Sequence, residues 1–561
     1  MSATSGADGR GERAAQPPGP CAELTAAQQR QLVLSLIDNL VRDGVAPRHI
    51  ETHISHVLLL RGHAYKIKKA LATSFLDQST LARRRAACAE ELRLNRRLAP
   101  QLYLDVVPIT GTLDAPVLGG DGPALEVALK MRAFDDDGLW DRLAARGALC
   151  ADDVDDLAAV LARFHAEAAV AEPTGWLGTP AQLRSALQDS LRDLQAPAPD
   201  AAWPDAIDRL DLARLQSWEA EDFPRLEATM RHRLAAGRVR EGHGDLHLGN
   251  VARADGRCLV FDGIEFNAEF RWIDVMSDVA FMAMDLHAHR LPGLAHRFVN
   301  AYLQHSGDYD GMRVFDYYLV HRALVRAKVA QLRATQAAAG EGNERDAARA
   351  AAHRYLLSAS RFATPRPRAL LITHGLSGSG KTTLTQSLLE AIGAPRIRAD
   401  VERKRLAGLA PLQGSRSMPG AGLYDAAMNA AVYTRLLDAA SVVLEGGWPV
   451  ILDATFLRRA DRDAARRHAA ALGVPFVILH FTAAPELLRE RVRQRAAQAQ
   501  DASEADATVL ALQAQAQEPL QPDEWASVHA VQASTSPAPA PRADWAPLLA
   551  RLGMPTPSNG A

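Results

Sequence analysis

Apolar and polar residues follow two different periods along this chain, and the changes of period predict its order of elements. From residue 24 the apolar positions recur at helical spacing, and they then change to short apolar runs typical of strands. The Arg61-Gly62 pair separates two of these runs and predicts a tight hairpin turn. The elements expected in this part are strands at 54–60 and 64–69, a helix at 80–98, and strands at 106–109 and 125–131.

The rest of the chain reads as a long helical region followed by a second region of strands and helices. The helical pattern covers 152–240, with a proline-containing break at 196–204, and a strand-loop segment follows at 238–266. Helices are expected again up to residue 362. Pro365 and Pro367 cannot continue a helix, and a new apolar strand begins directly after them at 369–373. We therefore place a domain boundary in this segment.

These patterns predict two domains with a linker and two unstructured ends. Residues 1–22 carry too little apolar surface to offset the entropy of ordering, so we expect them to be disordered. Proline repeats near residue 540 indicate an extended, low-complexity tail. The predicted segments are a disordered N-terminus at 1–22, a first domain at 23–362, a linker at 363–368, a second domain at 369–530 and a tail at 531–561.

Composition narrows the class of protein. A length of 561 residues exceeds what one hydrophobic core usually serves, which agrees with two domains. The net charge of -2 lacks the basic excess of a nucleic-acid-binding protein, so a nucleic-acid partner is not expected. The four cysteines form no C-x-x-C pair, and no apolar run is long enough for a membrane helix. We expect a cytoplasmic protein without a membrane partner.

The second domain begins with a phosphate-binding sequence. Residues 375–382 read Gly-Leu-Ser-Gly-Ser-Gly-Lys-Thr and match G-x-x-x-x-G-K-[ST] between a predicted strand and a predicted helix. The glycines let backbone N–H groups turn toward phosphate oxygens. Lys381 is expected to contact the β- and γ-phosphates, and the Thr382 hydroxyl to hold Mg²⁺. The residues expected to bind ATP here are Gly375, Ser377, Gly378, Ser379, Gly380, Lys381, Thr382 and Thr383.

Further polar residues of the second domain are candidates for the same site. Asp453 ends the apolar strand 450–453 and is a candidate Mg²⁺ ligand, directly or through water; an ordinary aspartate at a strand-end turn is the alternative. Asp400 ends a predicted strand at 397–400, where it can accept a proton from a hydroxyl substrate, while Arg403 binds the substrate; a helix N-cap with a surface arginine is the alternative. Arg491 and Arg495 share one helix face and suit a lid over the phosphates, or a plain surface.

This half of the chain, over 369–513, resembles small P-loop kinases of the gluconate-kinase and polynucleotide-kinase type. The likeness is specific only at the phosphate-binding sequence. It implies a P-loop NTPase fold, in which a parallel sheet lies between two layers of helices.

The first domain contains the sequence His-Gly-Asp-Leu-His-Leu-Gly-Asn at 243–250, followed by a strand that leads to Asp262. This stretch resembles the H-G-D-x-H-x-x-N loop of the aminoglycoside and choline phosphotransferase superfamily. The resemblance implies a bilobal protein-kinase-like fold, with Asp245 as the catalytic carboxylate and Asn250 and Asp262 as Mg²⁺ ligands. His243 and His247 have i, i+4 spacing, so a zinc site is the alternative, although Gly244 and Gly249 argue against a helix there.

The same resemblance gives roles to charged residues nearer the N-terminus. Lys66 and Lys68 fall on one face of a strand, and one of them is expected to reach the α- and β-phosphates, with Lys66 favoured. Glu91, or else Glu90, is the candidate ion-pair partner on the next helix. A solvated basic edge strand is the alternative. The hairpin before Lys66 lacks a G-x-G-x-x-G loop, as in the aminoglycoside phosphotransferase group.

Together the two domains resemble bacterial bifunctional proteins described as aminoglycoside phosphotransferase/ATP-binding proteins. The resemblance implies two ATP/Mg²⁺ sites that phosphorylate hydroxyl groups of small molecules, and it does not establish an antibiotic substrate. Two other functions remain open from the sequence. The first domain can instead bind a ligand and regulate an active P-loop domain, or the whole chain can act as a nucleotide-dependent sensor.

Overall fold

The computed structural model describes residues 23–52, 54–72, 76–196, 206–336, 342–411, 413, 422–498, 502–532 and 544–554. These residues form two compact units. The first contains the described residues up to Phe134 together with Glu265–Asn267, and the second contains Asp135–Ile264 and the described residues from Ala268 onward. The predicted disorder of 1–22, nearly all of the break at 196–204 and most of the predicted tail lie outside the described residues.

The first unit is built on a six-stranded antiparallel sheet with the strand order β1-β2-β3-β6-β4-β5. Its hairpin between β2 and β3 turns at Arg61 and Gly62, whose φ angles are 48° and 74°, as the sequence predicted. The strands are β1 (Arg48–Glu51), β2 (Ser55–Leu60), β3 (His63–Lys68), β4 (Tyr103–Gly111), β5 (Pro116–Leu118) and β6 (Glu126–Arg132).

The two faces of this sheet carry different side chains because strand residues alternate in direction. Apolar residues such as Ile67 and Ala128 pack against Leu32 and Leu36 of helix α1 (Ala26–Arg42). Helix α2 (Leu81–Asn95) packs against β4 and β6. The alternate residues of β3, Lys66 and Lys68, both bond to Glu91 of α2. One face of β3 is thus apolar, and the other is charged.

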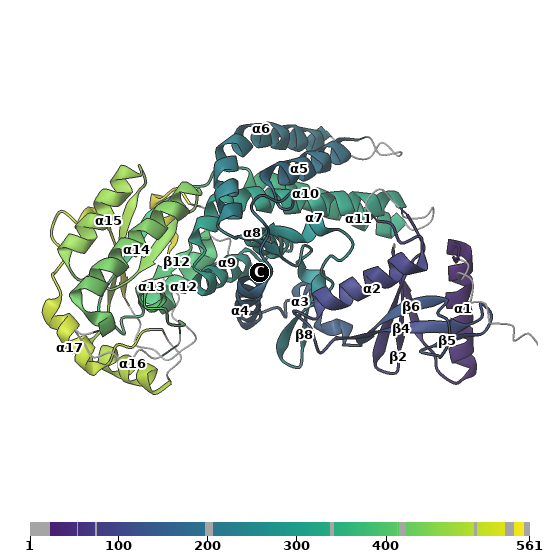
Figure 1. Cartoon of the computed structure of the whole chain (residues 1–561). Coiled ribbons are helices and arrows are strands. Elements are labelled where there is room, and N and C mark those ends of the chain that lie inside the picture. The colour runs from purple at the N-terminus through teal and green to yellow at the C-terminus, as the bar shows by residue number, and fades with distance from the viewer. Residues whose placement is uncertain are drawn as a thin grey trace, which may run out of the picture. The chain divides into compact units, whose positions relative to one another are not determined.

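The second unit begins with a mainly helical part. Its central helix α8 (Val275–Ala288) is buried along most of its length and packs against α9 and α10. Figure 1 shows the long helices gathered around it. The other helices are α3 (Trp140–Ala145), α4 (Ala151–Glu167), α5 (Pro180–Gln195), α6 (Ala206–Ala235), α7 (Ala268–Arg271), α9 (Pro292–Ser306), α10 (Met312–Gln336) and α11 (Gly342–Phe362). This part also contains two pairs of strands, β7 (Val239–Glu241) with β10 (Trp272–Asp274) and β8 (Val251–Ala254) with β9 (Arg257–Val260).

An α/β part completes the second unit, and its parallel sheet was predicted from the sequence. Five parallel strands lie in the order β12-β13-β11-β14-β15. Residues that alternate along β11 are fully buried on both faces of the sheet, so helices cover both faces. The strands are β11 (Leu370–His374), β12 (Arg396–Arg398), β13 (Val450–Asp453), β14 (Phe476–Thr482) and β15 (Val528–Gln532). The helices are α12 (Lys381–Ile392), α13 (Ala399–Leu406), α14 (Ala426–Glu445), α15 (Arg459–Ala471), α16 (Pro485–Gln498), α17 (Ala507–Ala516) and α18 (Ala546–Arg551).

Two predicted boundaries in this part need correction. The tail was placed at 531–561, but β15 runs to Gln532, and α18 buries Leu548 and Leu549 in the same core as Leu388 of α12. Helix α18 has only 6 residues, so its apolar pattern is too short to recognise in the sequence next to the proline repeats. The strand predicted at 397–400 ends at Arg398. Asp400 instead lies in the first turn of α13, where its negative charge interacts favourably with the positive end of the helix dipole.

None of the helices that the structure describes combines the length and the apolar character needed to span a bilayer. The predicted linker at 363–368 contains no strand, and only a turn and a bend continue the end of α11. It is fixed by Arg366, whose guanidinium bonds to Asp316 at 2.9 Å and lies 3.6 Å from the ring centre of Trp448. The predicted division into two separate domains stays a prediction.

Candidate active sites

The loop at 243–250 connects β7 to β8 and is shaped by close backbone contacts. Gly244 has a φ of 86°, and a Cβ atom there would lie 2.6 Å from the carbonyl oxygen of Phe270, so only glycine fits. His243 donates from Nε2 to the Phe261 carbonyl at 2.9 Å and accepts the Asp245 N–H at Nδ1. Burial also lowers the pKa of His243 and keeps it neutral. Both ring nitrogens are therefore engaged, which leaves this histidine no lone pair for the zinc alternative.

Asp245 lies at the centre of this loop. Its Oδ2 atom is 3.4 Å from Nε2 of His247 and accepts a hydrogen bond from Nδ2 of Asn250 at 3.1 Å. Because Nδ1 of His247 accepts the Gly249 N–H, the proton of this imidazole sits on the nitrogen that faces Asp245. Burial raises the pKa of Asp245, but the interaction with His247 and the charge of Arg326 outweigh it and hold the pKa below its usual range. Asp245 is thus ionised at neutral pH, with 35% of its side chain exposed.

The β8–β9 hairpin brings the second predicted Mg²⁺ ligand back toward the loop. Phe261 donates its N–H to the carbonyl of Asn250 at 3.1 Å, so Asp262 lies one residue beyond this pair. Asp262 has a φ of 61°, which is uncommon for a residue other than glycine. Backbone strain of this kind is concentrated at functional sites.

Buried side chains of α8 and α10 hold the 243–250 loop. Asp278 accepts the N–H groups of His243 and Gly244 at 2.8 and 2.9 Å, so it supports the backbone of the loop. Asp285 accepts the Leu248 N–H at 2.9 Å, and Arg322 donates to the Gly244 carbonyl at 3.0 Å. Sequence reasoning missed Asp285 and Arg322 because they lie in helices far along the chain, with no motif of their own.

The first unit brings both predicted lysines to the predicted glutamate. Lys66 bonds to Glu91 at 2.8 Å and Lys68 bonds to its other oxygen at 2.5 Å. Lys68 also pairs with Glu265, a residue that the sequence did not single out. Burial raises the pKa of Glu91, but the two lysines lower it to about 2. The side chain of Lys68 is fully buried, whereas that of Lys66 is 14% exposed, so Lys66 is the more accessible of the two.

The glycine-rich loop at 375–382 lies between β11 and α12, as the sequence predicted. Gly375 and Gly378 have φ angles of 145° and 83°, and a Cβ atom at Gly375 would lie 2.5 Å from the Phe481 carbonyl. Gly380 stands directly before α12, whose first turn presents backbone N–H groups and a partial positive charge. Such a loop is shaped to bind an anion with its backbone.

Three predicted side chains meet at this loop. Lys381 donates to the carbonyls of Gly375 and Leu376 at 3.0 and 2.9 Å. Thr382 donates its hydroxyl to Asp453 at 2.7 Å, which joins the start of α12 to the end of β13. Burial lowers the pKa of Lys381 to about 8, and the charges of Asp453 and Asp400 oppose that shift only in part.

A cavity of about 790 Å³ opens in front of the glycine-rich loop. Its lining includes the remaining predicted residues of this half, Thr383, Asp400, Arg403, Arg491 and Arg495. Arg403 is held by the Leu423 carbonyl and by Asn429 at 2.9 and 2.8 Å, so it braces the wall of the cavity. Arg491 approaches the Gly378 carbonyl at 3.4 Å and Arg495 donates to the Ala505 carbonyl at 3.2 Å. All of them therefore face one space.

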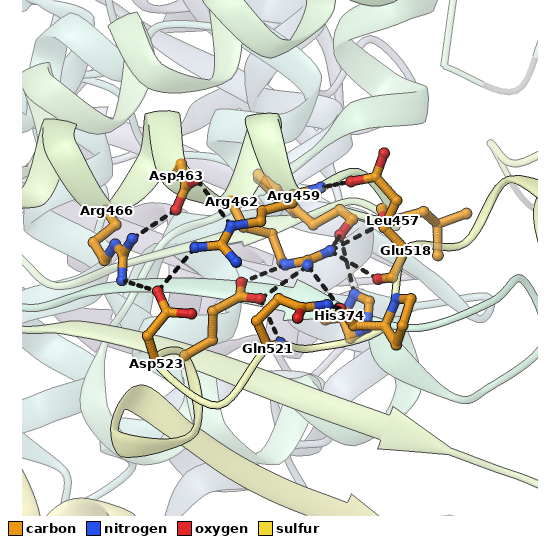
Figure 2. Close-up of polar contacts among 12 residues, drawn as sticks. His374, Leu457, Arg459, Arg462, Asp463, Arg466, Glu518, Gln521 and Asp523 are labelled. Atoms are coloured by element: carbon orange, nitrogen blue, oxygen red, sulfur yellow. Dashed lines mark hydrogen bonds and ion pairs between the residues drawn. The ribbon is translucent and has the colours of Figure 1, made fainter.

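Two further contacts in this part of the chain were not predicted. Gln513 of α17 accepts the Ser377 N–H at 3.0 Å, inside the loop that would receive a phosphate. Buried Arg462 of α15 donates to the carbonyl oxygens of Leu457 and Glu518 and pairs with Glu524 at 2.6 Å. Figure 2 shows Arg462 at the centre of this cluster, with Arg459 and Asp523 beside it. The cluster ties the segment after α17 to the turn that follows β13.

The helical part of the second unit contacts the cavity region from behind. Asn300 of α9 accepts the backbone N–H of Arg396 at 2.8 Å, and Arg396 in turn bonds to Thr385 of α12 at 3.1 Å. Tyr309 donates to buried Glu402 of α13 at 3.3 Å. The helix that starts at Lys381 and the helix that carries Asp400 are thus both packed against the helical part.

Two family models match the chain, one on each half. Residues 65–315 match the phosphotransferase enzyme family, and residues 370–520 match an AAA domain. Structure comparison pairs 60% of this chain with a whole choline/ethanolamine kinase family protein from Mesorhizobium loti, at 11% identity and a TM-score of 0.35. It also pairs 30% of the chain with 86% of a sugar kinase from Janibacter, at 23% identity and a TM-score of 0.24. The first family match, together with the 243–250 loop, defines the class of protein: a kinase-type phosphotransferase.

The chain also has relatives that span both halves. Uncharacterized proteins of Mycobacterium tuberculosis and Mycobacterium bovis are each 31% identical to it over 461 residues, which is 82% of this chain and 89% of each relative. The chain therefore belongs to the same family as these mycobacterial proteins. Its own two family matches fit a two-part kinase-like protein.

Proposed function

We propose that the chain is an ATP- and Mg²⁺-dependent phosphotransferase with two nucleotide sites, each of which moves the γ-phosphoryl group of ATP to a hydroxyl group of a small molecule. The observation that carries this proposal is the pairing of Thr382 with Asp453 at 2.7 Å beside the buried side chain of Lys381, in the lining of a cavity of about 790 Å³. The contact between Asp245 and Asn250 supports an equivalent site on the 243–250 loop.

At the site on the 243–250 loop, Asp245 orients the acceptor hydroxyl and receives its proton as the new O–P bond forms and ADP leaves. Its ionised state and its exposure on one side suit this role. The amide oxygen of Asn250 and the carboxylate of Asp262 are hard oxygen donors of the kind that Mg²⁺ prefers. Bound Mg²⁺ would neutralise charge on the transferring phosphoryl group.

In the first unit, Lys66 is the proposed contact for the nucleotide phosphates. Glu91 orients it through the 2.8 Å bond to its ammonium group. Lys68 was a candidate for the same role, but its buried bonds to Glu91 and Glu265 make it a support for Glu91. This distinction refines the sequence-based choice of Lys66.

At the glycine-rich loop, the backbone N–H groups and Lys381 hold the phosphates, while Thr382 and Asp453 supply oxygen ligands that fit Mg²⁺. Asp400 is the proposed acceptor of the substrate proton, and Arg491 and Arg495 the proposed lid cations. Arg403 bonds to Leu423 and Asn429, so we propose that it shapes the acceptor pocket. Gln513 must release the Ser377 N–H when a phosphate enters the loop.

A second function, regulation of the glycine-rich site by the kinase-like part, is favoured by one observation. Asn300 and Tyr309 of the helical part bond to Arg396 and Glu402, which adjoin the residues proposed to bind nucleotide and acceptor. A ligand that moves α9 would shift these contacts. This function does not exclude catalysis at the 243–250 loop.

The test is phosphoryl transfer from labelled ATP across a panel of hydroxyl-bearing metabolites, with the wild type, Asp245→Ala and Lys381→Ala compared. We expect each variant to lose a different phosphorylated product. Loss of the same product in both variants would support the regulatory function, since one site would then depend on the other. Products that are unchanged in both variants would overturn the proposal.

A further inference from the structure

A cluster of two histidines and a glutamate lies on β1 and β2 of the first unit, and none of the three residues has a role in the proposed function. His49 and Glu51 are two positions apart on β1, so their side chains leave the strand on the same face. His56 of β2 is the direct antiparallel partner of Glu51, and cross-strand neighbours of this kind lie close together. One nitrogen of each histidine and one carboxylate oxygen all lie within 4.8 Å of one another.

The distance between the two imidazole nitrogens is close to the distance between two nitrogens that bind the same metal ion. Nε2 of His49 and Nδ1 of His56 are 3.2 Å apart. Two nitrogens that are each bonded to a tetrahedral zinc ion at 2.0–2.1 Å are about 3.3–3.4 Å apart. This spacing lets one metal ion bind both nitrogens once each ring turns its lone pair toward the ion.

We propose that His49, Glu51 and His56 form a binding site for a divalent transition metal ion, with Zn²⁺ as the expected occupant. Two imidazole nitrogens and one carboxylate oxygen are ligands that Zn²⁺ prefers, and they leave a fourth position for water. Glu51 is exposed and His56 is buried, so the ion would enter from the sheet edge and bind against the interior. The bound ion would fasten edge strand β1 to β2.

The surrounding charges are compatible with this site and limit its affinity. Burial lowers the pKa of His56 to about 4, which keeps the imidazole in the neutral form that binds metals. Lys69, which follows β3, bonds to one oxygen of Glu51 at 2.8 Å and is a competing cation for this carboxylate. Arg30 of α1 adds a second positive charge near His56. Mg²⁺, which prefers oxygen ligands, is not expected to compete for the two imidazoles.

The test is equilibrium dialysis of the chelator-treated full chain against Zn²⁺ in the presence of excess Mg²⁺, which occupies sites built from oxygen ligands. We expect His49→Ala and His56→Ala each to bind one zinc ion fewer than the wild type. Glu51→Gln changes an exposed position and should not disturb folding. We expect this substitution to weaken the binding of the zinc ion about tenfold or more. His63→Ala, on neighbouring β3, is the matched control and should bind zinc like the wild type.

Co²⁺ gives a second readout because the intensity of its visible absorption reports tetrahedral coordination. The wild type and His63→Ala should show this absorption, and the three ligand variants should lose it or reduce it. If all variants bind as many zinc ions as the wild type with unchanged affinity, the site does not exist. A loss of zinc in His63→Ala equal to that in His49→Ala would also overturn the proposal.

Discussion

The two proposed phosphotransfer loops differ in the contacts that hold them in place. The 243–250 loop depends on buried side chains from other elements, since Asp278, Asp285 and Arg322 bond to its backbone. The 375–382 loop depends mainly on its own glycines and on the helix that follows it, with one distant side chain, Gln513, that accepts the Ser377 N–H. A loop that is held by distant side chains can lose its function through substitutions far away in the chain. A loop shaped by its own backbone is sensitive mainly to local changes.

The first prediction separates the two sites and has the largest effect. Asp245→Ala removes the carboxylate that orients the acceptor, and we expect transfer at this site to fall about 10²–10⁴-fold, the usual contribution of a positioned base. Transfer at the glycine-rich loop should keep its rate. The measurement is steady-state transfer to each acceptor found in the panel. Asp255→Asn, in the exposed turn between β8 and β9, is the control and should behave like the wild type. Equal losses at both sites would contradict independent chemistry.

The second prediction separates the two lysines of the first unit. Lys68→Met leaves Glu91 and Glu265 buried beside each other without their shared cation. Breaking a buried pair in this way costs about 3–5 kcal/mol, so we expect a large loss of stability in the first unit. Lys66→Met should keep the stability and raise the KM for ATP. Chemical denaturation and ATP kinetics on both variants measure the two effects. The assignment fails if Lys66→Met destabilises the protein more than Lys68→Met.

Much of this contrast could be predicted from the sequence, because its strongest signals are local. The glycine-rich loop, the strand that leads to Asp453, the two lysines that meet Glu91 and the β2–β3 hairpin each follow from short patterns. Glu265, Asn300 and Arg462 could not be predicted, since each acts through a partner that is distant in the sequence. Helix α18 was missed because its apolar run is only a few residues long.

The third prediction concerns pH. The pKa of Lys381 is lowered from 10.5 to about 8, so in the absence of nucleotide the ammonium loses its proton above pH 8. Bound phosphates favour the charged form, so ATP binding at this loop must then take up a proton. We expect ATP affinity to be level below pH 8 and to fall up to tenfold per pH unit above it. Calorimetry in buffers of different ionisation enthalpy measures the proton uptake.

The same pKa shift has a consequence for stability. The pKa of Lys381 is lower in the folded protein than in the unfolded chain, so its buried ammonium lowers the folding stability at neutral pH. This loss of stability is recovered as the pH rises from about 8 toward 10.5. Lys381→Met should therefore show a smaller gain in stability over this window than the wild type. At the 243–250 loop, the lowered pKa of Asp245 predicts loss of activity only at acid pH. An identical pH profile for both sites would contradict the comparison.

The fourth prediction has the smallest effect and tests the contact between the helical part and the glycine-rich site. Asn300→Ala removes the side-chain oxygen that accepts the backbone N–H of Arg396, and the loss of a buried hydrogen bond costs about 1–3 kcal/mol. We expect a higher KM for ATP at the glycine-rich loop and no change at Asp245. Gln304→Ala on the same helix is the control, because its recorded contact with Arg405 uses the backbone carbonyl. If both variants change the KM equally, α9 has no specific positioning role.

The central claim is that one chain holds two nucleotide sites, and the most direct test counts them. Calorimetric titration with Mg²⁺ and a non-hydrolysable ATP analogue should give two equivalents for the wild type. Lys381→Ala and Lys66→Met should each give one equivalent at the same analogue concentration, and the double variant none. A wild type that binds a single equivalent, lost entirely in one of these variants and kept in the other, would contradict the account.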